Sequence, residues 1–370
     1  MIHSRQMFRA NPEVLVSNLA APAASTQESY SGDTVSTRGM KQERTQYAGR
    51  SSAILAHRVS KTVSPPSPVR LRGVLLLAVV THGTGGDMSK LKLEFSDVVS
   101  ETLLIPLWAR AVEQRESTPL VSDPVAAAMV EQIDYAWRRI RVSRGDLVQC
   151  VVRLREFDRF VRDFLARHPE SIVVHVGCGL DARFQRVDNG LVRWFDLDLQ
   201  DVIDIRRRLL PESDRNQYVA GSVFDSGWME HVGRRGGEPM LVVAEAVLPY
   251  FEESKVKGLI LALVRRFPGA ELVTDVCSPH AVRIDNLHLR VAGSSARMQW
   301  GVRHPRDLEG WSPGIELVES FSYFDDPEPR MGFPSWFGRI PVLRQASSLQ
   351  RYQLGTAPSA SRTDAGPRNA

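Results

Sequence analysis

A short glycine-containing loop followed by two acids carries the clearest chemistry in this sequence. The loop Gly177–Asp181 reads G-C-G-L-D and directly follows a run of mostly β-branched residues, SIVVHV, at positions 171–176. Glycines let the backbone turn tightly and approach a ligand, because no Cβ stands in the way. Asp196 and Asp198 follow about 20 residues later, the separation at which a carboxylate accepts hydrogen bonds from a ribose. The pattern predicts a cofactor site beyond the carboxyl ends of two strands.

The residues of this loop leave the kind of cofactor open. The loop lacks the third glycine of G-x-G-x-x-G, which dinucleotide-binding folds use beneath a pyrophosphate. Arg183 follows the loop, where such a motif would continue with small residues. S-adenosylmethionine has no phosphate, so a shorter loop suffices for it. The loop therefore favours S-adenosylmethionine over NAD(P), and a plain strand-to-helix turn with surface carboxylates stays open as a third interpretation.

Strand-like and helix-like segments alternate after residue 169. The run at 171–176 is apolar apart from Ser171 and His175, as expected for a strand that is buried on both faces. Further strands are predicted at 191–197, 217–220, 239–244 and 270–276, with helices at 201–210 and 252–267. Strands that alternate with helices are typical of a parallel, doubly wound sheet. We therefore expect an α/β, Rossmann-like core over residues 169–344 with mostly parallel strands.

Residues 88–168 have a different pattern, which predicts a helical cap in front of this core. Apolar residues recur there at roughly helical spacing. One helix is expected to start after Asp123 and Pro124, because aspartate is a favoured N-cap and proline suits the first helical position. Another is expected at 151–168. Cap and core together define one predicted functional domain, residues 88–344.

The two ends of the chain are predicted to lie outside that domain. Residues 1–87 are rich in small and polar residues without a helical or strand period, which favours a disordered or non-native extension. Their one apolar run, at 73–80, is far shorter than the roughly 20 residues that span a bilayer. Residues 345–370 are again polar and small, and a disordered tail is predicted there.

The overall composition excludes several classes of partner. The 370 residues include 47 basic and 43 acidic side chains, a net charge of +4, and the basic residues form no stripe that would indicate nucleic-acid binding. The three cysteines have no disulfide framework and no zinc-ligand spacing. We expect a cytoplasmic protein with no metal, no nucleic-acid partner and no membrane association.

Several motifs in order resemble one known family. The stretch HVGCGLDARFQRVDNGLVRWFDLD at 175–198 is similar to the signature of the leucine carboxyl methyltransferase family, and in particular to its bacterial polyketide O-methyltransferases. Further similar motifs are ETLLIPLWARAVE, DVIDIRRRLLPE, SVFDSGW, AEAVLPYF and FPGAELVTD. The resemblance covers residues from about 88 to 340. It implies a class I methyltransferase fold with helical additions and S-adenosylmethionine as the cofactor.

The resemblance also implies roles for individual residues. Arg153 matches the arginine that binds the methionine carboxylate of the cofactor, although an arginine in this arginine-rich helix could also be a solvated charge. Asp198 matches the ribose-binding acid, with Asp196 beside it, and either of them could instead cap the next helix. Glu245 matches an acid beside the cofactor. The other cofactor-binding candidates are Gly177, Gly179, Asp181, Ser222, Val223 and Asp225.

Candidates on the acceptor side are fewer. Tyr250 should lie near the acceptor, and Arg110 could orient an acceptor anion or pair with Glu113 on its own helix. Ala246 stands where the family commonly has glycine or another small residue. Cys178 is expected to fill the loop rather than act as a nucleophile, and His175 to be a core histidine. The sequence offers no dedicated base, which favours a carboxylate or an already acidic hydroxyl as the acceptor.

Three functions are therefore weighed. The first is a small-molecule O-methyltransferase, with a polyketide-like acid as one candidate acceptor. The second is an NAD(P)-dependent oxidoreductase, against which the missing third glycine counts. The third is a methyltransferase-like module that binds its ligand without catalysis, and the retained Arg153, Asp198 and Glu245 weigh against it.

Overall fold

A computed structural model describes residues 90–93, 102–140, 142–291, 295–326, 328–332 and 335–355. The predictions made for residues 1–87, for the apolar run at 73–80 and for the start of the helical cap lie outside these residues. In the part of the chain that the model describes, no helix has the length and apolar character needed to cross a membrane.

One seven-stranded sheet, in the order β3-β2-β1-β4-β5-β7-β6, forms the centre of the described residues. The five strands predicted from the sequence are confirmed, and β1 to β5 pair in parallel. The sheet is therefore mostly parallel, as expected. The strands are β1 (Ile172–Val176), β2 (Arg193–Asp198), β3 (Asn216–Ala220), β4 (Met240–Ala244), β5 (Ala270–Cys277), β6 (Ile315–Ser322) and β7 (Ser347–Leu354).

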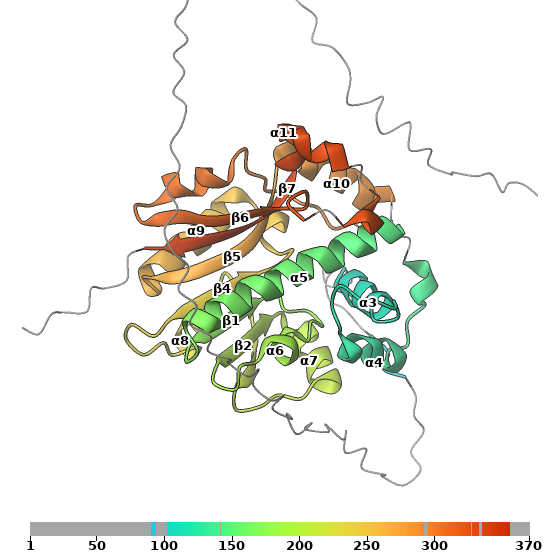
Figure 1. The fold of residues 1–370 in the computed structure, drawn as a ribbon. Helices are drawn as coiled ribbons and strands as arrows, with labels where there is room; N and C mark the ends of the chain where they lie inside the picture. The colour runs from blue at the N-terminus through green and yellow to red at the C-terminus, as the bar shows by residue number, and fades with distance from the viewer. Residues whose placement is uncertain are drawn as a thin grey trace, which may run out of the picture. The chain divides into compact units, whose positions relative to one another are not determined.

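The prediction of a disordered tail from residue 345 is wrong for its first part. β7 lies between β5 and β6 and pairs antiparallel with both of them, although it is far from β5 in sequence (Figure 1). The polar residues of this segment led to the prediction of a tail. In the fold, Ser348 and Gln350 are buried, and they are hydrogen-bonded to each other at 2.7 Å. Tyr352 is also buried and donates its hydroxyl to the Pro305 carbonyl. The strand belongs to the core of the sheet.

Two of the predicted helices, at 201–210 and 252–267, agree with the observed helices Gln200–Leu209 and Glu253–Arg266 to within one residue at each end. Asp123 caps its helix as predicted, since its side chain accepts the Ala126 amide hydrogen and Pro124 is the first helical residue. The long helix α5 starts earlier than predicted, at Arg144, because Ser143 caps it and accepts the Asp146 amide hydrogen. The α-helices are α3 (Leu104–Glu113), α4 (Pro124–Gln132), α5 (Arg144–Arg167), α6 (Arg183–Val187), α7 (Gln200–Leu209), α8 (Gly227–His231), α9 (Glu253–Arg266), α10 (Pro279–Val291) and α11 (Pro341–Arg344).

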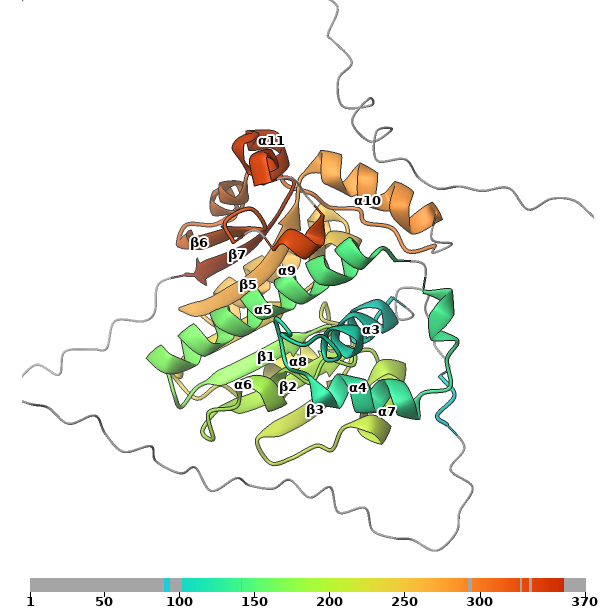
Figure 2. The same cartoon turned by 45° about the vertical axis from the view of Figure 1, so that its right-hand side comes forward.

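Helices cover both faces of the sheet. α5 crosses one face, where Phe157, Phe160 and Phe164 pack against alternate residues of the central strands. α8 and α9 cover the other face through Trp228, Ile260 and their neighbours. Figure 2 shows α3 and α4 stacked beside α5, with α10 and α11 at the end of the molecule where β6 and β7 lie. The carboxyl ends of the parallel strands therefore lie close to α5 and α3.

Candidate functional site

The loop after β1 is built around two glycines in the left-handed backbone conformation. Gly177 has φ +61° and Gly179 has φ +49°. A Cβ on Gly177 would lie 2.3 Å from Cγ2 of Val247, which approaches from the segment after β4. The Gly179 amide hydrogen is donated to Oδ2 of Asp198 at 2.7 Å. The loop therefore needs glycine for its backbone shape, and the acid at the end of β2 holds it in place.

The strand register places four candidate residues in one row. Val176 of β1 is level with Leu197 of β2 and with Ala244 of β4, and Ala244 is level with Thr274 of β5. The next residue on each strand continues this row along the carboxyl edge of the sheet. The row consists of Asp198, Gly177, Glu245 and Asp275.

Glu245 joins two arginines from different helices. Its Oε1 accepts the Arg153 Nε hydrogen at 2.8 Å, and its Oε2 accepts a hydrogen bond from Arg183. These charges hold the pKa of Glu245 below its ordinary value, although burial alone would raise it. The pair places Arg153 of α5 directly over the end of β4. The structure thus brings two of the predicted site residues into contact.

Below the loop lies a buried network of arginines and acids, which the sequence analysis did not foresee. Arg183 is 0% exposed and also contacts Asp158 and Asp181, at 2.8 and 3.2 Å. Arg186 contacts both of these acids at 2.8 Å. Ion pairs with Arg183 and Arg186 therefore hold the side chain of Asp181, which is one of the predicted cofactor residues.

Arg110 belongs to this network and does not face an acceptor. It is 4% exposed, donates to the Leu180 carbonyl at 2.8 Å and pairs with Asp123 at 3.0 Å. The structure gives no support to the acceptor-side prediction for Arg110, because its guanidinium is directed at the underside of the loop. The alternative pairing with Glu113 is wrong, since Glu113 binds Arg330.

The structure does not favour Asp196 as a cofactor ligand either, and that role stays a prediction. Asp196 is 0% exposed, and its Oδ2 accepts from Arg206 at 2.7 Å. Its Oδ1 accepts from the Trp194 indole at 2.9 Å and lies 3.3 Å from His175. His175 is buried among these groups, which confirms that it is a core histidine. Asp198, two residues further along β2, is the acid that reaches the loop.

The loop after β3 holds three of the predicted cofactor-binding residues, Ser222, Val223 and Asp225. Ser222 Oγ accepts the Phe224 amide hydrogen at 3.2 Å. Val223 is buried in the apolar core together with residues of β1 and β4, so its side chain is occupied by packing. The Asp225 side chain is exposed. The backbone of this loop, rather than the Val223 side chain, is the part that could contact a ligand.

The segment after β4 has the strained backbone of the site. Among the described residues other than glycine, only Ala246 has a positive φ, +55°. Its amide hydrogen is donated to Oδ1 of Asp275 at 2.7 Å. Such a conformation costs of order 1–3 kcal/mol in a residue other than glycine, and glycine would avoid this cost because it has no Cβ. Tyr250 follows in the 3-10 turn Leu248–Tyr250, and burial raises the pKa of its hydroxyl to about 12.

Sequence reasoning missed three site residues, Asp275, Arg183 and Arg186. A carboxylate near the carboxyl end of a mostly apolar strand is the signal that could have found Asp275. No comparable signal marks the two arginines, because α6 is short and rich in charge. Cys178 is buried, and burial raises the pKa of its thiol well above the ordinary value, in agreement with a filling role.

Comparison with known proteins identifies the class of enzyme. Residues 104–264 match the family model described as leucine carboxyl methyltransferase. The tetracenomycin polyketide synthesis O-methyltransferase of Streptomyces glaucescens is 36% identical over 261 residues, which cover 69% of this chain and 96% of that protein. An S-adenosyl-L-methionine-dependent methyltransferase of Gibberella zeae is 28% identical, over 71% of this chain and 94% of that protein.

These similarities define an S-adenosylmethionine-dependent methyltransferase with the class I fold. The chain belongs to the leucine carboxyl methyltransferase family. The comparisons give no support to the NAD(P)-dependent oxidoreductase. A solved DUF574 family protein of Streptomyces avermitilis has a TM-score of 0.46 at 13% identity, over 70% of this chain and 99% of that one, and adds no weight to the assignment.

The residues present fit this cofactor. The carboxylate of Asp198, at the end of β2, suits ribose hydroxyls. Burial raises the pKa of this carboxyl group, and the hydrogen bonds from the Gly179 and Leu199 amides oppose that shift. Arg153 and Glu245 present opposite charges side by side, which matches the carboxylate and ammonium groups of an amino acid.

Proposed function

We propose that the protein is an O-methyltransferase whose acceptor is a small, polyketide-like molecule with a carboxylate or an acidic hydroxyl. The main support is the 36% identity with a polyketide O-methyltransferase over 96% of that protein's length. The row of Asp198, Gly177 and Glu245 at the carboxyl edge of the sheet supports the proposal from the side of the structure. We also propose that the enzyme works in the cytoplasm without a nucleic-acid partner. Residues 88–354 would form its catalytic domain, which includes β7.

In this proposal each residue has a separate task. Asp198 accepts hydrogen bonds from the ribose, the glycines of the loop allow close approach, and Arg153 binds the methionine carboxylate. When bound, the cofactor supplies an electrophilic methyl group on its sulfonium sulfur. The chain must then hold an acceptor oxygen in line and exclude water, and orientation of this kind can contribute roughly 7–11 kcal/mol.

Two measurements test this function. Calorimetric titration with S-adenosylhomocysteine and with NAD should show binding of the first alone. Incubation with isotope-labelled S-adenosylmethionine and a set of aromatic acids and phenols should transfer label to oxygen. Binding of S-adenosylhomocysteine without transfer to any acceptor would favour the non-catalytic module, and binding of NAD alone would contradict the proposal.

Replacement of Asp198 with alanine should weaken S-adenosylhomocysteine binding by about 10-fold or more, because a hydrogen bond to a charged group contributes roughly 1.5–3 kcal/mol. The loss of the Gly179 anchor acts in the same direction. Calorimetry of the folded variant measures the change. Asp204→Ala is the control, since Asp204 is exposed on the neighbouring α7. Unchanged affinity in Asp198→Ala would remove Asp198 from the site.

Replacement of Arg153 with lysine should raise the Kd for S-adenosylhomocysteine by about 10-fold, equivalent to about 1.4 kcal/mol. A lysine ammonium is a point charge and cannot reproduce a planar guanidinium that binds Glu245 and a ligand carboxylate together. Arg155→Lys, on the same helix, is the control and should bind normally. Equal affinity in the two variants would show that Arg153 serves the fold alone.

A further inference from the structure

Asp275 differs from every other buried carboxylate in the part of the chain that the structure describes. Eight acidic side chains are buried there, and seven of them have an arginine nitrogen within 4.0 Å. Those seven are Glu113, Asp123, Glu156, Asp158, Asp181, Asp196 and Glu271. Asp275 is 6% exposed and has no such partner. Burying a carboxylate without a counter-charge is unfavourable, so a residue of this kind indicates a function.

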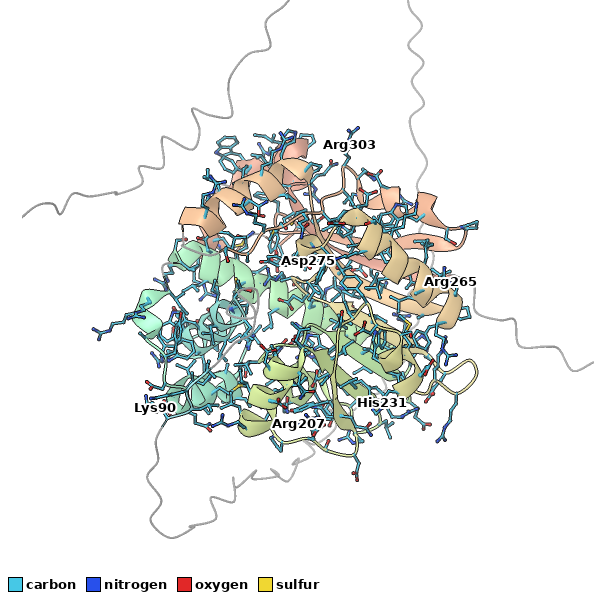
Figure 3. The ribbon with its side chains drawn as sticks, turned by 180° about the vertical axis from the view of Figure 1, so that it is seen from behind. Lys90, Arg207, His231, Arg265, Asp275 and Arg303 are labelled. Carbon is cyan, nitrogen blue, oxygen red and sulfur yellow. The ribbon has the colours of Figure 1, made fainter. Side chains whose placement is uncertain are left out.

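The position of Asp275 is fixed, and only one of its oxygens is used. Oδ1 accepts the amide hydrogen of the strained residue Ala246 at 2.7 Å. No other described residue holds Oδ2 in a hydrogen bond or an ion pair. Asp275 continues the row of Glu245 at the carboxyl edge, and Figure 3 labels it near the middle of the described residues. Its second oxygen is thus available beside the cofactor residues.

The groups around Asp275 are poor proton acceptors. Two arginines keep the pKa of Glu245 low, so its carboxylate is a weak base. Burial raises the pKa of Tyr250 and that of Cys277 to about 12, so both stay protonated at neutral pH. Tyr323 is shifted in the same direction. Burial also raises the pKa of Asp275, against the opposing effects of Arg153 and the Ala246 amide. The charged and titratable groups that face it are Arg153 of α5, Glu245, Tyr250, Cys277 and Tyr323.

We propose that Asp275 is the general base of the reaction and that the acceptor is an un-ionised hydroxyl of the phenol class. The inference rests on the proposed methyl transfer and narrows its substrate. The hydroxyl proton moves to Oδ2 of Asp275 as the acceptor oxygen forms its bond to the methyl carbon. The carbon–sulfur bonding pair returns to sulfur, which leaves S-adenosylhomocysteine, and Asp275 then releases the proton to water. A carboxylate acceptor, already ionised, would need no such residue.

The test compares two probe acceptors, 1-naphthol and 1-naphthoic acid, with the full chain and S-adenosylmethionine. Asp275→Asn keeps an oxygen for the Ala246 amide hydrogen but removes the base, so it should fold normally. It should also bind S-adenosylhomocysteine as the wild type does. Methylation of 1-naphthol should fall about 100-fold in kcat, with little change in KM, because general-base catalysis contributes typically 10²–10⁴-fold. The loss should diminish at alkaline pH, where naphthol ionises unaided.

Asp285→Asn is the matched control, because Asp285 on α10 is a second carboxyl whose pKa burial raises. It should keep the wild-type rate and pH profile. A wild-type rate for Asp275→Asn, or a loss in Asp285→Asn in its place, would overturn the proposal. So would methylation of 1-naphthoic acid alone, or of neither probe, by a protein that binds S-adenosylhomocysteine. Failure to bind S-adenosylhomocysteine at all would instead overturn the proposed function.

Discussion

Replacing Arg183 with methionine should lower the free energy of unfolding by about 3–5 kcal/mol, the usual effect of removing one partner from a buried ion pair. Arg183 is 0% exposed and contacts Asp158, Asp181 and Glu245. Methionine fills a similar space but leaves these three carboxylates with less positive charge around them. Urea denaturation followed by circular dichroism measures the change. Cofactor binding should weaken as well, because Glu245 loses one of the two arginines that orient it.

Arg162→Met provides the matched control. Arg162 lies on α5 at the rim of the same network, is half exposed and approaches Asp158 only to 3.8 Å. Pairs of this kind contribute under about 1 kcal/mol, so the variant should unfold close to the wild type. If Arg183→Met loses no more stability than Arg162→Met, the network beneath the loop does not support the fold as described.

Replacing Gly177 with alanine should abolish most cofactor binding, with a rise in Kd of about 100-fold, equivalent to about 2.8 kcal/mol. The new Cβ would lie 2.3 Å from Cγ2 of Val247, so either the loop or the segment after β4 must move. The left-handed φ of +61° adds backbone strain. Both segments belong to the proposed site, which makes the effect on binding larger than the effect on stability. Calorimetric titration with S-adenosylhomocysteine measures it.

Two further variants separate strain from collision. Gly190 also has a left-handed φ, +84°, but a Cβ there would meet no atom within 4 Å. Gly190→Ala should therefore lose some stability and keep normal binding. Adding Val247→Ala to Gly177→Ala removes the colliding methyl group and should restore part of the affinity. Normal binding by Gly177→Ala alone would show that the loop is not the cofactor cradle.

The local sequence pattern was sufficient to predict the parallel strands β1 to β5 but not the antiparallel strands β6 and β7. β1 and β4 are short, mostly apolar runs, and all five strands alternate with helical segments along the chain, so local pattern and burial agree there. β7 is half polar, and it forms a strand because β5 and β6 supply hydrogen-bond partners on both sides. A segment stabilised by neighbours distant in sequence has no strong local signal, which is why a tail was predicted.

The sequence by itself determined the class of the enzyme, because several of its motifs resemble one family in order, and it predicted the loop after β1 and Asp198 as the cofactor site. Only the tertiary structure decided which charged residues are available to a ligand. Asp196 and Arg110 looked as suitable as Asp198, yet both are used up in buried ion pairs. Asp275 was not a candidate, yet it alone among the buried carboxylates described has no arginine nitrogen within 4.0 Å. Whether a buried charge is paired depends on residues from other helices and strands, and that information is absent from any single segment of the chain.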